Sequence, residues 1–221
     1  GIGTALPFLL LIGLMLLTAL PLWLARDLLP DVTAHAGSPA WGMLAAAPAI
    51  FVAAFAAGIN DSALWALLGL YGLRHGIGET ETLFLLSAFA AGTVALQLPL
   101  GWLADRGGLG RWLYVSAAAG ALGALLLPFT MGHPALLWLL LFGWGGLMVG
   151  LYTLGLALLG DRFQGPPLAG ANALFISIYA VGSTTGPPLY GAAMDLLGPD
   201  ALPGGVLVVC AVLMAMGLFT L

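Results

Sequence analysis

Asp61 is the charged side chain that lies deepest within the apolar segments of this chain. Asn60 and Ser62 flank it, and Trp65 follows one helical turn later on the same face. An ionised carboxylate at the centre of a lipid bilayer costs on the order of 2.5–3.5 kcal/mol on insertion scales, so Asp61 should face a cavity, contact a partner or carry a proton. Two interpretations stay open: a polar solute path through the membrane, or a structural hydrogen-bonded site.

Other polar groups in apolar segments are few. Gln97 and Asn172 are amides that either contact a solute or join helices by hydrogen bonds. The three histidines lie in separate connections, and Cys210 is the single cysteine, so we expect no metal site and no cofactor. No histidine lies within these segments, and Asp61 has no second carboxylate partner deep inside them, which argues against an intramembrane enzyme.

Composition indicates that lipid is the solvent. Hydrophobic residues make up 62% of the chain and charged residues 6%, against about 25% charged in soluble proteins. The net charge of −4 argues against a nucleic-acid partner, since phosphate binding needs clustered basic side chains. Seven apolar segments, each near the ~20 residues that span a bilayer as a helix, run roughly over 4–24, 43–72, 82–104, 112–130, 135–160, 168–197 and 203–221.

The arginines predict an orientation. Arg26, Arg106, Arg111 and Arg162 fall in odd-numbered connections, and only Arg74 falls in an even-numbered one. Cytoplasmic loops carry the excess of basic residues, so the odd connections and the C-terminus should be cytoplasmic. The protein is then a multi-pass protein of the cytoplasmic (inner) membrane.

A short polar motif joins the third and fourth segments. It reads Gly101-Trp102-Leu103-Ala104-Asp105-Arg106-Gly107. This motif resembles the loop signature of the major facilitator superfamily, roughly G-x-L-a-D-r-x-G-r-r, which joins the second and third helices of each six-helix half. After Gly107 the chain departs from that pattern, with Gly108-Leu109-Gly110-Arg111 in place of a Gly and two basic residues.

The resemblance implies an all-α membrane protein whose seven transmembrane helices are equivalent to helices 6–12 of the major facilitator fold. Residues 1–26 would be the last helix of the N-terminal half, 27–42 a short cytoplasmic connection, and 43–221 the C-terminal six-helix half. That half would contain two inverted three-helix repeats, about 43–130 and 135–221. The chain is then a fragment, and the N-terminal half of the same transporter is its missing partner.

The resemblance also implies a cytoplasmic gate. In the family the loop Asp lies against the start of the eleventh helix and pairs with nearby arginines, which holds the cytoplasmic side shut. A carboxylate is favoured near the free amides of a helix start. The residues that carry this role here would be Gly101, Asp105, Arg106, Arg111, Asp161 and Arg162. The alternative is that these charges only set the topology.

The sixth segment contains a pattern typical of helix bends. It comprises Gly182, Gly186, Pro187, Pro188 and Gly191. Glycines four residues apart let helix backbones approach closely, and the prolines remove amide donors and bend the helix. The pattern indicates either a bend that moves between conformational states or a static kink with close packing.

The sequence therefore predicts a secondary active transporter that moves a small-molecule substrate across the lipid bilayer by alternating access. Asp61 is its candidate proton-coupling residue, with Asn60, Trp65, Gln97 and Asn172 along the path. A neutral or apolar solute is favoured over a strongly anionic one, because no intramembrane cation exists. The alternative is a non-transporting scaffold or assembly subunit with a facilitator-like fold.

The predicted topology is testable by cysteine labelling in intact cells. We expect cysteines placed in the loops 74–79 and 105–111 to react with membrane-impermeant reagents from opposite faces, because these loops follow successive helices. Residues 27 and 221 should both be cytoplasmic. Labelling of the two loops from one face would refute this arrangement.

Overall fold

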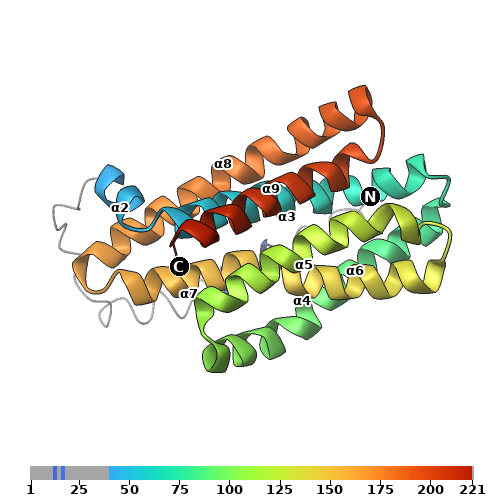
Figure 1. The fold of residues 1–221 in the computed structure, drawn as a ribbon. Coiled ribbons are helices and arrows are strands. Elements are labelled where there is room, and N and C mark those ends of the chain that lie inside the picture. Colours follow the sequence, from blue (N-terminus) through green and yellow to red (C-terminus); the bar gives the residue numbers. More distant parts are fainter. Residues whose placement is uncertain (1–11, 14–15, 18–39, 221) are drawn as a thin grey trace. The chain divides into compact units, whose positions relative to one another are not determined.

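The described part of the chain is built from α-helices. The computed structural model describes residues 12–13, 16–17 and 40–220, with side chains described as far as residue 216. The helices are α2 (Ala40–Ala46), α3 (Pro48–Arg74), α4 (Glu79–Gly107), α5 (Leu109–Thr130), α6 (Pro134–Met148), α7 (Gly150–Arg162), α8 (Pro166–Leu197) and α9 (Ala201–Thr220) (Figure 1). The predicted all-α membrane fold is confirmed for these ranges.

Six of the seven predicted segments coincide with helices. Five spans are long and apolar enough to cross a membrane, with Pro134–Arg162 counted as one, and the described part of α9 is a shorter apolar helix over Ala201–Met216. The first predicted segment, 4–24, lies outside the described residues except at 12–13 and 16–17.

Two predicted boundaries differ from the structure. The connection expected over 27–42 already turns helical at Ala40, and the long helix begins at Pro48, after Ala47 separates it from α2. Proline suits this first position, because its missing amide would have no partner there and its φ is already helical. The single segment expected at 135–160 is interrupted at Val149, between α6 and α7.

A glycine follows both α4 and α8, and each of these helices ends with a Gly-x-x-x-Asp pattern, Gly101 to Asp105 and Gly191 to Asp195. Gly108 follows α4 with φ of 90°, and Gly198 follows α8 with φ of 97°. Side chains other than glycine rarely adopt this left-handed region, so these two positions allow the chain to reverse sharply.

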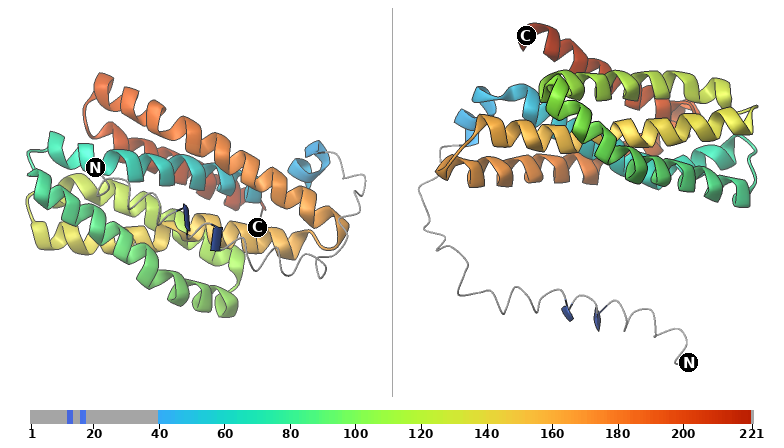
Figure 2. Two further views of the ribbon diagram at one scale, coloured as in Figure 1. Left: turned by 180° about the vertical axis from the view of Figure 1, so that it is seen from behind. Right: turned by 90° about the horizontal axis from the view of Figure 1, so that it is seen from below.

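The helices pack in three main pairs. Helix α3 runs along α8, α4 along α6, and α5 along α9 (Figures 1 and 2). The buried core between them is made of aliphatic side chains and alanines, with Leu64, Leu141 and Leu213 fully buried. Helices far apart in the sequence are therefore neighbours in the bundle.

Two of these pairs meet through bare backbone. A Cβ atom at Gly58 of α3 would collide with the carbonyl oxygen of Tyr179 in α8, and one at Gly182 would lie 2.6 Å from the carbonyl oxygen of Phe55. Small residues at such contacts let helices in lipid gain van der Waals packing.

The second pair, α4 and α6, meets in the same manner. A Cβ at Gly145 would collide with the carbonyl oxygen of Phe89, and one at Gly92 would collide with that of Phe142. The absence of a side chain at Gly92 and Gly145 therefore sets the spacing between α4 and α6.

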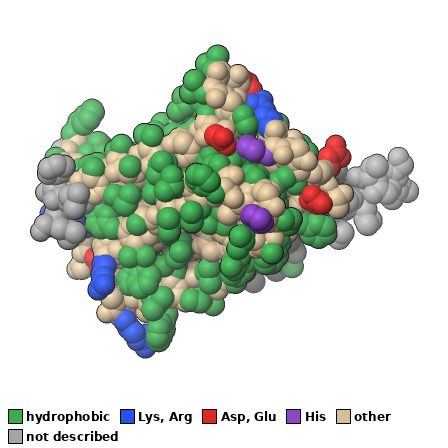
Figure 3. All heavy atoms as spheres, turned by 45° about the vertical axis from the view of Figure 1, so that its right-hand side comes forward, with side chains coloured by type: hydrophobic (Ala, Val, Ile, Leu, Met, Phe, Trp, Pro, Cys, Tyr) green, Lys and Arg blue, Asp and Glu red, His purple; other side chains and the backbone are tan. Residues whose placement is uncertain are grey.

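The two ends of the bundle differ in charge. One end carries the α3–α4 and α8–α9 turns, where Arg74 forms an ion pair with Asp195, and Tyr71 donates a hydrogen bond of 3.0 Å to Asp200. Figure 3 shows acidic side chains and histidines gathered there. The other end carries the α4–α5 and α7–α8 turns, with Arg106, Arg111 and Arg162.

The glycine contact between α3 and α8 predicts a specific sensitivity. Gly58→Ala should lower the free energy of unfolding by about 1–3 kcal/mol, because the new methyl group overpacks a backbone contact that cannot yield. Thermal unfolding of the purified complete protein measures this loss. Gly143→Ala is the matched control, since its Cβ would meet nothing within 4 Å and alanine favours helix. An equal loss in both variants would contradict the close-contact explanation.

Candidate solute-binding site

Asp61 is held by two hydrogen bonds from different helices. Trp65, one turn further along α3, donates from Nε1 to Oδ1 at 3.0 Å. Tyr179 of α8 donates from its hydroxyl to Oδ2 at 3.0 Å. The close approach of α3 and α8 brings Tyr179 within reach, so the carboxylate joins the two helices inside the bundle.

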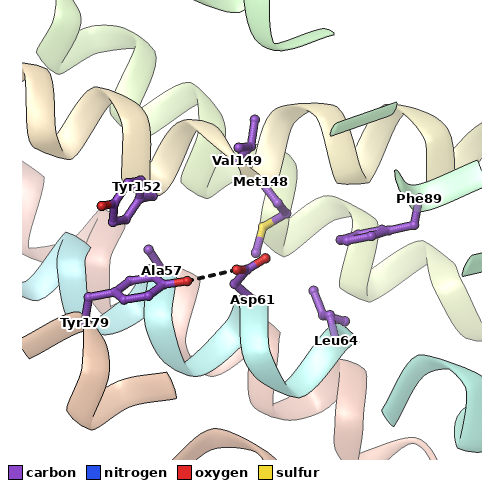
Figure 4. A pocket seen from close by; sticks show the side chains of 8 residues that line it. All are labelled: Ala57, Asp61, Leu64, Phe89, Met148, Val149, Tyr152 and Tyr179. Carbon is purple, nitrogen blue, oxygen red and sulfur yellow. Dashed lines mark hydrogen bonds between the residues drawn. The ribbon is translucent and has the colours of Figure 1, made fainter. Parts of the chain in front are cut away.

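The Asp61 carboxylate faces a cavity of about 110 Å³. The lining residues come from α3, α4, α8 and the α6–α7 junction: Ala57, Asp61, Leu64, Phe89, Met148, Val149, Tyr152 and Tyr179. Figure 4 shows Met148 facing the carboxylate, with the two tyrosines on one side and Phe89 on the other. Of the environments expected for Asp61, both a cavity and hydrogen-bond partners are present, and its place on a solute path stays a prediction.

Aromatic rings flank Asp61 in two edge-to-face pairs. The rings of Trp65 and Phe89 lie 5.5 Å apart, and those of Tyr152 and Tyr179 lie 4.9 Å apart. Of these four rings, Phe89, Tyr152 and Tyr179 line the cavity. The cavity therefore combines one carboxylate with apolar aromatic walls.

The cavity wall carries no basic side chain in the part of the chain that the structure describes. The four described arginines lie in or next to the last or first turn of a helix, away from Asp61. Within the same ranges, no group of three His, Cys, Asp or Glu side chains could bind a metal ion. The carboxylate is compensated by neutral donors alone.

Asn60, predicted to line the path, has a different environment. It is fully buried, accepts a hydrogen bond of 2.9 Å from the hydroxyl of Tyr190, and donates one of 3.6 Å to Sγ of Cys210. Successive residues on a helix point about 100° apart, so Asn60 faces α8 and α9 while Asp61 faces the cavity. The structure therefore gives Asn60 a bridging position between three helices.

Gln97 and Asn172 are not gathered around Asp61. Gln97 is exposed beside Trp102 and Asp105 in a shallow recess on α4. Asn172 is half-buried on α8 in another recess, next to the turn at Gly165. Of the five residues predicted to line the solute path, only Asp61 and Trp65 form a hydrogen bond with each other.

The predicted gate charges are exposed in this half of the protein. Asp105 has no hydrogen bond or ion pair with any other described residue, and the guanidinium of Arg106 lies 3.9 Å from the ring centroid of Trp102. Arg162 donates a hydrogen bond of 3.4 Å to the carbonyl oxygen of Ala46. The pairing of Asp105 at the start of α8 stays a prediction.

The predicted bend residues lie on one continuous helix. Helix α8 extends through Pro187 and Pro188, and Gly186 packs against the backbone of Ile59. The hydroxyls of Thr184 and Thr185 donate to carbonyls one turn earlier, each at 2.8 Å. These hydroxyls are therefore not free to satisfy carbonyls left open by the prolines, and movement at this site stays a prediction.

Several cavity residues were not singled out in the sequence, among them Phe89 and Met148. Met148 and Phe89 belong to long apolar runs, where nothing in their type separates a cavity wall from core packing. The hydroxyl of Tyr179 was the available signal, because a buried tyrosine hydroxyl in lipid needs a hydrogen-bond partner.

The bridge at Asn60 predicts a structural effect that is separate from the cavity. Tyr190→Phe leaves the buried amide oxygen of Asn60 without its donor, which should cost about 1–3 kcal/mol in unfolding free energy. Tyr114→Phe is the matched control, because that hydroxyl has no partner among the described residues. Thermal unfolding of both variants checks this, and equal stability would remove the bridging role.

Comparisons with known proteins agree with this architecture. The family model described as Major Facilitator Superfamily matches residues 50–221. The uncharacterized MFS-type transporter YfkF of Bacillus subtilis (strain 168) is 31% identical over 151 residues, which are 66% of this chain and 37% of that protein. The matched region thus spans little more than a third of this curated relative, and no solved structure matches the chain significantly. The family match covers all the helices from α3 onward, so the chain belongs to the major facilitator superfamily.

Proposed function

We propose that this chain supplies the C-terminal half of a secondary active transporter that moves a small solute across the cytoplasmic membrane by alternating access. The observation that carries the proposal is the Asp61 cavity, where α3, α4, α6, α7 and α8 converge around one intramembrane carboxylate. Intramembrane ionisable groups are costly and mark solute or proton pathways. Family membership and the similarity to an MFS-type transporter support the same activity.

The proposed division into two inverted three-helix repeats, about 43–130 and 135–221, has support in the helix pairing. The first helix of each repeat packs on the second helix of the other, α3 on α8 and α6 on α4. The close contact of Gly58 with the Tyr179 carbonyl, between α3 and α8, corresponds to the contact of Gly145 with the Phe89 carbonyl, between α6 and α4. Inverted repeats that cross at a midplane site are the architecture through which many transporters alternate access.

The proposed orientation has support in the charges at the two ends. The arginine-rich end with Arg106, Arg111 and Arg162 would be cytoplasmic, and the acidic end with Asp195 and Asp200 would face outward. In the complete protein, Asp105 would then be available to close the cytoplasmic side against another helix start.

The two groups that donate hydrogen bonds to Asp61 support proton coupling at this residue. The ionised carboxylate accepts from both Trp65 and Tyr179. A protonated carboxyl group becomes a donor through one oxygen, and Tyr179 can then rotate its hydroxyl to accept, whereas the Trp65 indole can only donate. Proton uptake therefore changes the link between α3 and α8, which connects protonation to helix positions.

The test replaces Asp61 in the complete protein, using any radiolabelled solute that the wild type accumulates in proteoliposomes. Asp61→Asn should abolish accumulation driven by a pH gradient while sparing downhill exchange, because asparagine resembles the protonated carboxyl group but cannot release a proton. Glu79→Gln, an exposed acid outside the cavity, should behave as the wild type.

Two results would count against the proposal. Accumulation by Asp61→Asn with the wild-type pH profile would make Asp61 structural and place coupling elsewhere. The absence of saturable uptake by the wild-type protein for every solute tested would favour the alternative, a non-transporting scaffold or assembly subunit.

A further inference from the structure

We propose that the Asp61 cavity binds a monovalent organic cation that carries an aromatic or compact apolar group. This inference rests on the proposed transport function and names its substrate class. Its basis is the combination of one carboxylate, three aromatic rings and a thioether that line a single cavity.

The negative charge of Asp61, with no described basic side chain beside it, favours a positively charged ligand. The groups that face Asp61 from the neighbouring helices are Phe89 of α4, Met148 of α6, Tyr152 of α7 and Tyr179 of α8, and none carries a positive charge. A carboxylate at this depth is stabilised by a proton or by a cation that enters with the solute. An anionic solute would meet repulsion, and a neutral solute would supply no charge to balance the ionised carboxylate, so only a proton could neutralise it.

The aromatic walls select the body of the ligand. Cations within about 6 Å of an aromatic ring centroid are attracted to the negative face of the π system, and this recognises quaternary ammonium groups in particular. Phe89 lies on one side of Asp61, and Tyr152 and Tyr179 lie on the other (Figure 4). The sulfur of Met148 is polarizable and adapts to irregular apolar groups.

The cavity suits a small ammonium head. Its volume of about 110 Å³ accommodates that head beside the carboxylate, and the apolar body contacts Phe89 and Leu64. In the complete protein, the body can extend beyond this half toward the helices that complete the path.

A single carboxylate that binds either a proton or the organic cation would exchange one for the other. When Asp61 is protonated, its charge is gone and the organic cation loses its partner. When the cation enters, the carboxyl proton leaves to water and the carboxylate remains as the counter-ion. Proton and solute therefore occupy the site in turn, so an inward proton gradient would drive the cation outward.

The experiment measures binding to the purified complete protein in nanodiscs with a matched pair of probes. Phenyltrimethylammonium is the cation, and tert-butylbenzene is its neutral isostere of the same shape. We expect the cation to bind at least about 10-fold more tightly than the isostere and to release protons as it binds, by up to one per site.

Variants separate charge from shape. Asp61→Asn should weaken phenyltrimethylammonium binding at least about 10-fold and change tert-butylbenzene binding little, because the substitution removes charge and preserves size. Asp61→Ser provides a second neutral variant, and size-exclusion chromatography checks that both are folded. Glu79→Gln, an acid outside the cavity, should bind both probes as the wild type does.

Equal affinity of the wild type for both probes, or unchanged cation binding in a folded Asp61→Asn protein, would overturn the inference. Asp61-dependent, proton-driven accumulation of a neutral or anionic solute without cation binding would also overturn it, and the proposed transport function would stand. Cation binding that depends on Asp61, in a protein without flux, would support the site and remove the transport function.

Discussion

The backbone contact between α3 and α8 is the constraint on which the rest of this half depends. Gly58 has no side chain, so the carbonyl of Tyr179 comes against it, and the hydroxyl of the same tyrosine reaches Asp61 almost one helical turn further along α3. A larger residue at Gly58 would separate the helices and break that hydrogen bond. Packing and site chemistry are therefore parts of one contact, in a solvent where apolar burial itself provides little force between helices.

Neighbouring polar residues on α3 have different tasks because the helix turns about 100° at each residue. Asn60 joins Tyr190 of α8 and Cys210 of α9 in the dry interior. Asp61, the next residue, faces the cavity and accepts a hydrogen bond from Trp65. The first arrangement satisfies both ends of a buried amide, whereas the second leaves the carboxylate facing a cavity. Two adjacent polar residues thus differ in position: Asn60 joins three helices, and Asp61 lines the cavity.

The aromatic pairs connect the helices around the cavity. Edge-to-face contacts hold Trp65 of α3 against Phe89 of α4, and Tyr152 of α7 against Tyr179 of α8. Each pair thus joins neighbouring helices within one of the repeats that we propose. One repeat contributes the acid at this level, and the other contributes Met148 facing it (Figure 4).

The sequence by itself determined the solvent and the helices, and it singled out Asp61 as a candidate. Apolar segments long enough to span lipid must be helical, and one carboxylate among them stands out because its burial is costly. Only the tertiary structure decided which polar residues meet: Gln97 and Asn172 lie elsewhere, and Met148 joins Asp61. The physical reason is that, in long apolar helices, hydropathy gives no signal of which face meets a neighbour, and that choice depends on where glycines let backbones approach.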